Sequence, residues 1–181
     1  MDIGRHFSTA WDIYIKNFMT LIISMVIVAV LSVLTLGILV PVLITGFQMM
    51  FIKLKRGQEV TTNDLFVYMN KFWILLCAAV VGAIAVMIGL ILFIIPGLMI
   101  ATLLMYALLL IADKDMDIGA AFSKSSEIVK KNNFWMHFLF VLVNGFIGNM
   151  GSSFYGVGAL LTQPFAMGAI ACAYDDEVSS S

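Results

Sequence analysis

The sequence predicts an all-α integral membrane protein in which six hydrophobic helices form three helical hairpins. Composition is the first reason: 62% of the 181 residues are hydrophobic and only 12% are charged, whereas soluble domains carry about 25% charged residues. So few charges cannot cover a soluble globule. The composition therefore excludes nucleic-acid-binding proteins, disordered chains, coiled coils and disulfide-rich secreted domains.

The distribution of the charges is the second reason. All Asp, Glu, Lys and Arg residues fall into four clusters, which are separated by three uncharged stretches, residues 17–52, 72–112 and 132–174. One helix needs about 20 residues to cross a hydrocarbon core of about 30 Å, so each stretch is long enough for two crossings. Three double crossings would place every charged cluster and both termini on one face of the membrane. The positive-inside rule assigns that face to the cytoplasm.

The first hairpin is the shortest. With a turn of about four residues, each arm has roughly 16 residues and a length of about 24 Å, which is less than the hydrocarbon core. Two explanations remain open. Lys53 and Lys55 could extend the second arm and snorkel to the surface, or the hairpin could be re-entrant and shielded by its neighbours.

The three hairpins also predict an internal threefold repeat within one membrane domain, residues 1–181. A phenylalanine that follows a charged or amide residue lies at or near the start of each uncharged stretch, and one of the three prolines follows in each. Pro41 and Pro96, with Gly97, are expected at hairpin breaks, where a missing N–H is harmless; Pro164 is expected to kink the last helix. The repeats span residues 1–56, 57–113 and 114–177, before a flexible tail at 178–181. The outer turns are expected at Leu36, Gly37 and Ile38, at Ile95, Pro96 and Gly97, and at residues 149–153.

An amphipathic helix is expected before each hairpin, over residues 3–18, from Thr61 onward, and over 118–132. In each segment apolar residues recur at helical spacing opposite polar ones, as in helices that lie in the headgroup plane. Trp11, Trp73 and Trp135 fall near this one interface and are the expected interfacial anchors. The segments could serve only as anchors, or they could form a collar that senses lipid or docks a partner.

The sequence contains no constellation that indicates catalysis. Its two histidines and two cysteines have no metal-ligand spacing, and neither a phosphate-binding loop nor a nucleophile–histidine–acid arrangement is present. We therefore expect no enzyme activity, no cofactor and no metal. No Asp, Glu, Lys or Arg falls within the predicted spans, and this argues against ion-coupled transport, which needs ionisable groups at membrane depth.

One polar stripe stands out in the fifth hydrophobic arm. His137, Asn144, Gly148 and Gly151 are spaced by seven, four and three residues, so they share one helix face. Two interpretations remain open: interhelical hydrogen bonding with close backbone approach, or a hydrated path or polar-ligand pocket with His137 as its titratable lip. The candidate pore-lining residues are His137, Asn144, Gly148, Gln163 and Gln48.

Small residues four apart predict close helix packing. Whether these surfaces pack within one chain or between copies in a homo-oligomer is left open by the sequence. The expected packing residues are Ala78, Gly82, Ala85, Gly89 and Gly168.

Three segments carry a resemblance to a known family: LFIIPGLMI at 92–100, AAFSKSSEIVKKNNFW at 120–135 and PFAMGAIACAY at 164–174. They resemble the multi-pass membrane domain that is attached to some bacterial glycerophosphoryl diester phosphodiesterases and also occurs alone. The resemblance covers roughly the carboxy-terminal two thirds of the chain. It implies a helical domain of the bacterial inner membrane, often beside phospholipid metabolism, and carries over no phosphodiesterase activity.

Together these features predict a non-enzymatic inner-membrane protein that acts as a self-associating scaffold in the lipid bilayer. Two alternatives stay open. One is a passive pore or facilitator for a small neutral solute or lipid, and the other is an accessory subunit of a phospholipid-metabolising enzyme.

Overall fold

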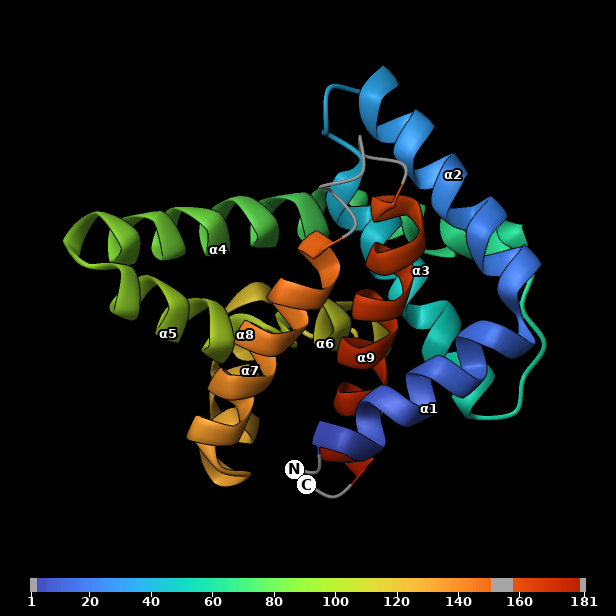
Figure 1. Ribbon diagram of the computed structural model, residues 1–181. Helices are drawn as coiled ribbons and strands as arrows, with labels where there is room; N and C mark the ends of the chain where they lie inside the picture. Colours follow the sequence, from blue (N-terminus) through green and yellow to red (C-terminus); the bar gives the residue numbers. More distant parts are fainter. Residues whose placement is uncertain (1–2, 151–157, 180–181) are drawn as a thin grey trace.

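A computed structural model describes residues 3–150 and 158–179, and every regular element in these two ranges is helical (Figure 1). The predicted all-α fold class is therefore confirmed. Of the expected tail, residues 178 and 179 still belong to the last helix, and residues 180 and 181 lie outside the described ranges. The elements are α1 Ile3–Lys16, α2 Phe18–Leu34, α3 Val40–Lys55, the 3₁₀ helix η1 Thr62–Lys71, α4 Phe72–Leu92, α5 Ile94–Leu104, α6 Ala107–Lys114, α7 Ile118–Lys131, α8 Phe134–Met150 and α9 Ala159–Ser179.

Two helical segments are long and apolar enough to cross a membrane. They are Thr62–Leu92, formed by η1 and α4, and Ile94–Lys114, which contains α5 and α6. A third candidate arises if α1 and α2 count as one span, although these two helices are bent by 94°. Helix α8 is apolar but shorter. These spans are consistent with a membrane protein.

A helix occupies each of the three segments that were expected to be amphipathic. The 94° bend between α1 and α2 suits an interfacial helix followed by a membrane helix. Segment η1 differs from the expectation because it is a 3₁₀ helix that leads directly into α4. Between α7 and α8 the chain turns at Asn133, whose φ of 73° is positive; asparagine tolerates this conformation better than most residues.

The first outer turn lies where the sequence predicts it. Between α2 and α3, Leu36 and Gly37 have φ values of 51° and 84°, and Pro41 follows in the first turn of α3. The next reversal comes earlier than expected: α4 ends at Leu92, Phe93 is extended, and Pro96 and Gly97 lie inside α5. If the helix continued past Leu92, the Leu92 carbonyl would clash with the ring of Pro96 four residues later. The break at Phe93 removes that clash.

The last outer turn falls mostly outside the described residues. Of the expected turn at 149–153, only residues 149 and 150 are described, and both belong to the end of α8. Pro164 lies inside α9, which continues past it.

Helices α3 and α9 form the centre of the structure. Most of α3 is buried, including Phe47 and Phe51. A Cβ atom at Gly168 of α9 would lie only 2.3 Å from the Phe51 ring, so only glycine permits this approach of α9 to α3. At Gly46 of α3, a Cβ atom would lie 2.4 Å from the backbone oxygen of Leu65 in η1. Gly46 and Gly168 thus permit the close approach of η1 and α9 to α3.

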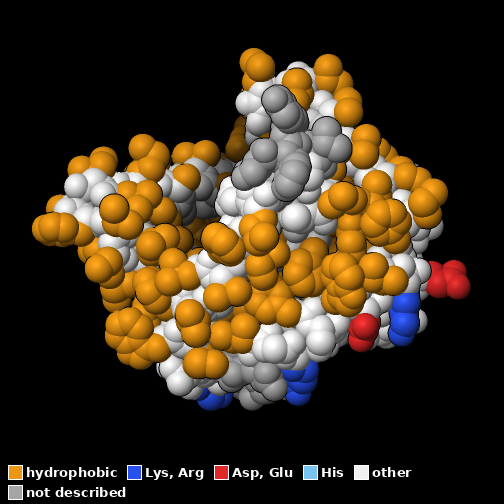
Figure 2. All heavy atoms as spheres, viewed as in Figure 1, with side chains coloured by type: hydrophobic (Ala, Val, Ile, Leu, Met, Phe, Trp, Pro, Cys, Tyr) orange, Lys and Arg blue, Asp and Glu red, His pale blue; other side chains and the backbone are white. Residues whose placement is uncertain are grey.

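Helices α4 and α5 form an antiparallel arm that extends away from the other helices (Figure 1). Its outer side chains are apolar and uncovered, with Ile91 80% exposed and Phe93 76% exposed. Hydrophobic side chains also cover most of the face in Figure 2, and charged side chains appear there only along the lower and right edges. Such a surface requires an apolar environment, as lipid or another protein surface would supply.

Candidate functional site: a charged junction of helix ends

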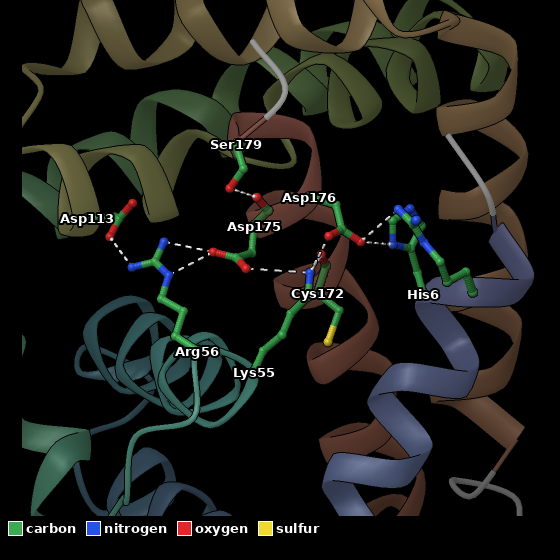
Figure 3. Close-up of polar contacts among 9 residues, drawn as sticks. His6, Lys55, Arg56, Asp113, Cys172, Asp175, Asp176 and Ser179 are labelled. Carbon is green, nitrogen blue, oxygen red and sulfur yellow. Dashed lines mark hydrogen bonds and ion pairs between the residues drawn. The ribbon is translucent and has the colours of Figure 1, made fainter.

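Four helices bring charged side chains together at one place, which we call the charged junction (Figure 3). The charged residues lie near helix ends, at the beginning of α1 and at the ends of α3, α6 and α9. The members of the charged junction are Arg5 and His6 of α1, Lys55 of α3 with Arg56 directly after it, Asp113 of α6, and Asp175 and Asp176 of α9.

Arg56 connects the ends of three helices. Its Nη2 lies 2.8 Å from Oδ1 of Asp175, and its Nη1 lies 3.4 Å from Oδ1 of Asp113. The hydroxyl of Tyr174 donates a hydrogen bond to the other Asp113 oxygen at 3.0 Å. Burial opposes the charge on Arg56, but the hydrogen bonds and charges of Asp175 and Asp113 raise its pKa above the ordinary value. The guanidinium therefore stays charged and clamps α3, α6 and α9 together.

Lys55 neutralises the end of α9. Its Nζ lies 2.7 Å from Oδ1 of Asp176 and 3.5 Å from Oδ2 of Asp175, and it donates a hydrogen bond to the Cys172 carbonyl at 2.9 Å. Carboxylates in the last turns of a helix are disfavoured by the helix dipole, whereas a cation there is favoured. Lys55 thus offsets the cost of the acidic sequence that ends α9.

Helix α1 joins the junction through two residues that contact Asp176. Oδ2 of Asp176 lies 3.3 Å from Nη2 of Arg5 and 3.2 Å from Nδ1 of His6. The second contact lacks hydrogen-bond geometry, because His6 Nδ1 has no hydrogen-bond partner among the described residues. Burial opposes ionisation of Asp176, but the hydrogen bond and charge of Lys55, with Arg5, lower its pKa. Asp176 is therefore a carboxylate at neutral pH.

A second lysine makes a similar connection nearby. Lys71, the last residue of η1, donates hydrogen bonds to the carbonyls of Ile111 and Ala112 at 3.1 and 2.8 Å. It also lies 2.5 Å from Oδ1 of Asp115. Lys71 therefore ties the start of α4 to the end of α6. Lys53 of α3 pairs in the same manner with Asp64 of η1.

The geometry makes the charged junction an electrostatic clamp. Its cations and carboxylates contact one another, and its histidine is buried. Within residues 3–150 and 158–179, no group of three or more His, Cys, Asp or Glu side chains could hold a metal ion. The chemistry that the junction offers is thus charge pairing and, at His6, proton binding.

The predicted polar stripe is buried in the structure, where Gly148 packs against α9 and the His137 ring lies 5.9 Å from that of Tyr106, between α5 and α6. His137, Asn144 and Gly148 are all buried. The side chains of Thr162 and Gln163 donate hydrogen bonds to the Gly148 carbonyl at 3.0 and 3.2 Å. Gln48 is buried in α3, and no hydrogen bond joins it to the stripe among the described residues. Gly151, the last member of the stripe, lies outside the described ranges.

The expected packing residues take different places. Gly89 lies against Gly97 of α5, since its Cβ would be 2.8 Å from the Gly97 Cα, and Ala78 is buried. Gly82 and Ala85 are only half-buried. Ala78 and Gly82 line an apolar groove of about 290 Å³ between α4 and the helices α5, α6 and α7. Trp11, Trp73 and Trp135 are exposed.

Sequence reasoning missed the charged junction. It used the four charged clusters only to assign sides of the membrane. The available signal was their complementarity, because a basic sequence at 53–56 follows one hydrophobic arm and an acidic one at 175–177 follows another. Pairing of opposite charges at helix ends on one side could have been inferred from it.

Comparisons with protein-family models, with curated proteins and with solved structures found no match for this chain. The resemblance to the phosphodiesterase-associated membrane domain therefore stays an expectation.

Proposed function

We propose that this chain is a non-enzymatic scaffold of the bacterial inner membrane that self-associates. Its six hydrophobic helices form three hairpins related by an internal repeat, and both termini lie in the cytoplasm. The charged junction fixes the hairpins to one another at the cytoplasmic face. The apolar sides remain available for lipid and for further copies of the chain.

One observation supports this proposal most strongly. Helices α3, α6 and α9 close the three proposed hairpins, and the charged residues at their carboxyl ends meet through Arg56, which contacts both Asp113 and Asp175. The second hairpin also begins close to where it ends, since Lys71 ties the start of α4 to the end of α6. Hairpins whose last arms end together at a polar site are expected where each returns the chain to one side of a membrane.

Single-thiol labelling tests the topology. With Cys77→Ser as background and Cys172 buried, Leu36→Cys and Phe93→Cys each place one accessible thiol at an exposed outer turn, and Lys130→Cys places one on α7. We expect an impermeant maleimide to label positions 36 and 93 only from the periplasmic side and position 130 only from the cytoplasm. Labelling of all three from the same side would overturn the hairpin topology.

The exposed arm of α4 and α5 supports self-association. Ile84, Ile88 and Ile91 are exposed along α4, and polar substitution on an interface should weaken it. We expect native mass spectrometry from nanodiscs to show an oligomer that Ile88→Gln dissociates. Val33→Gln, on the exposed face of α2, serves as the matched control and should leave the oligomer intact. A wild-type monomer, or equal effects of the two variants, would contradict self-association through this arm.

A passive pore is the second candidate, and two buried polar atoms favour it. Nε2 of His137 and Oδ1 of Asn144 have no hydrogen-bond partner among the described residues, as in a path that water or a polar solute enters. If the stripe conducts, His137→Ala and Asn144→Leu should abolish flux of a small neutral solute such as glycerol into proteoliposomes while assembly is unchanged. Absence of wild-type flux, or flux that survives both substitutions, removes this candidate.

A further inference from the structure

His6 occupies an unusual position for a titratable side chain. It is only 1% exposed, at a contact between α1, α9 and α8. Its Nδ1 lies 3.2 Å from Oδ2 of Asp176, and its ring meets Phe140 of α8 edge-on at 6.3 Å between centroids. Histidine is the side chain whose ordinary pKa falls within the range of cellular pH, so this contact can depend on a proton.

Burial is the main factor that opposes protonation of His6, and the charges around it act in both directions. Asp176 of α9 attracts a proton to the imidazole, but Lys55 of α3 and Arg5 of α1 repel it. The nearest aromatic side chain of α8 is apolar Phe140, with His137 one turn before it. Asp176 already contacts two cations, Lys55 at 2.7 Å and Arg5 at 3.3 Å.

We propose that His6 is a proton-controlled latch that holds α1 against α9 at neutral pH and releases it on acidification. Neutral His6 fits its buried place, where Asp176 already pairs with Lys55 and Arg5. Protonated His6 would be a third cation at a single carboxylate, and a buried charge without adequate pairing is strongly disfavoured. Release would free an amphipathic helix whose apolar side can enter the headgroup region.

The direction of the pH dependence follows from the burial of His6. Burial lowers the pKa of His6 below 6.5, and Asp176 only partly compensates. The folded state therefore favours the neutral imidazole. Its contribution to docking is fully present above pH 6.5 and is lost as the pH falls through the lowered pKa.

Trp11 reports on the docking of α1. Its ring lies 5.6 Å from that of Phe165 in α9, whereas Trp73 and Trp135 are exposed on other helices. In a Trp73→Phe, Trp135→Phe background in nanodiscs, Trp11 emission is measured from pH 7.5 to 4.5, together with far-UV circular dichroism. We expect a reversible shift in emission with a midpoint below pH 6.5 and no loss of helix signal.

Two variants separate the latch from general acid sensitivity. His6→Gln, which stays neutral, should abolish the transition. Arg5→Gln removes an exposed cation that repels the proton, so its midpoint should move to higher pH; Lys16→Gln, at the far end of α1, should leave the midpoint unchanged. A wild-type signal that is constant across this range, or an identical transition in His6→Gln, would overturn the latch. If His6→Gln does not fold, a midpoint in Arg5→Gln that equals the wild-type midpoint would overturn the latch.

Discussion

Single glycines decide how closely the central helices approach. At Gly168 a Cβ atom would lie between 2.3 and 2.6 Å from three atoms of the Phe51 ring. Phe51 is itself fully buried in α3, so its ring has little room to move. Close approach of backbones through small residues is the main packing device of membrane helices.

We therefore expect Gly168→Ala to destabilise the protein by about 1–3 kcal/mol, the usual cost of overpacking a filled core. The matched control is Gly145→Ala on α8, where a Cβ would meet nothing within 4 Å. Denaturation of the purified protein by SDS in mixed micelles, followed by circular dichroism, measures both. Equal midpoints for the two variants would show that the contact between α9 and Phe51 does not limit packing.

At the residue scale, sequence patterns predicted packing positions better than packing partners. The sequence predicts Gly168 as a packing residue, and the structure places it in a tight contact with Phe51. Gly82 has the same spacing signal, yet a Cβ there would meet only ordinary contacts at 3.7 and 3.8 Å. Spacing locates a small-residue face, but the facing element decides whether the face is filled.

At the scale of elements, the break between α5 and α6 is the feature that most needs support. Helix α5 ends at Leu104 and α6 begins at Ala107. The hydroxyl of Ser125 in α7 donates to the Leu103 carbonyl at 2.6 Å and accepts from the Tyr106 amide at 3.3 Å. A broken membrane helix persists where a neighbouring side chain satisfies the freed backbone groups, and Ser125 does so here.

Removal of this hydroxyl should cost stability. We expect Ser125→Ala to lower the free energy of unfolding by about 1–3 kcal/mol, because it leaves two backbone groups without their partner. Ser123→Ala, on the exposed side of the same helix, should change it by less than about 0.5 kcal/mol. The same SDS denaturation compares them. If Ser125→Ala leaves the free energy of unfolding unchanged, water or a shifted helix supplies the hydrogen bonds to the Leu103 carbonyl and the Tyr106 amide.

Lys71 gives a second prediction at this scale. Its ammonium caps the end of α6 through two carbonyls, and hydrogen bonds from a charged donor contribute about 1.5–3 kcal/mol. Lys71→Met keeps the aliphatic stem and removes the donor, so unfolding should begin at lower SDS concentration. Lys130→Met, an exposed lysine on α7, is the control. Amide hydrogen exchange should rise selectively at residues 107–114 in Lys71→Met, and uniform exchange in both proteins would contradict the cap.

For the whole molecule, the sequence predicted the kind of fold but not its assembly. Hydropathy and the spacing of charges depend on local sequence alone. They predicted nine helices, whereas the described residues form ten, because the chain breaks at Met105–Tyr106 between α5 and α6. The break at Phe93 also comes earlier than the expected turn. Those breaks depend on a proline clash one turn away and on Ser125 of another helix. The charged junction depends on contacts between residues separated by more than a hundred positions, such as Arg56 and Asp175, and no local pattern encodes them.

The junction also predicts how the whole molecule responds to acid below the range of the His6 latch. Lys55 and Arg5 lower the pKa of Asp176 below 3.8 despite its partial burial. The folded state thus favours the carboxylate, so this stabilisation is present above pH 3.8 and is lost as the pH falls through the lowered value. We expect the SDS concentration at the unfolding midpoint to decrease once the pH drops below about 4. Asp176→Asn should remove part of that decrease and should also lower the midpoint concentration at pH 7. Asp12→Asn, on the exposed side of α1, should leave the profile unchanged. A profile for Asp176→Asn parallel to that of the wild type between pH 5 and 3 would show that the carboxylate does not join α1, α3 and α9 in the folded protein.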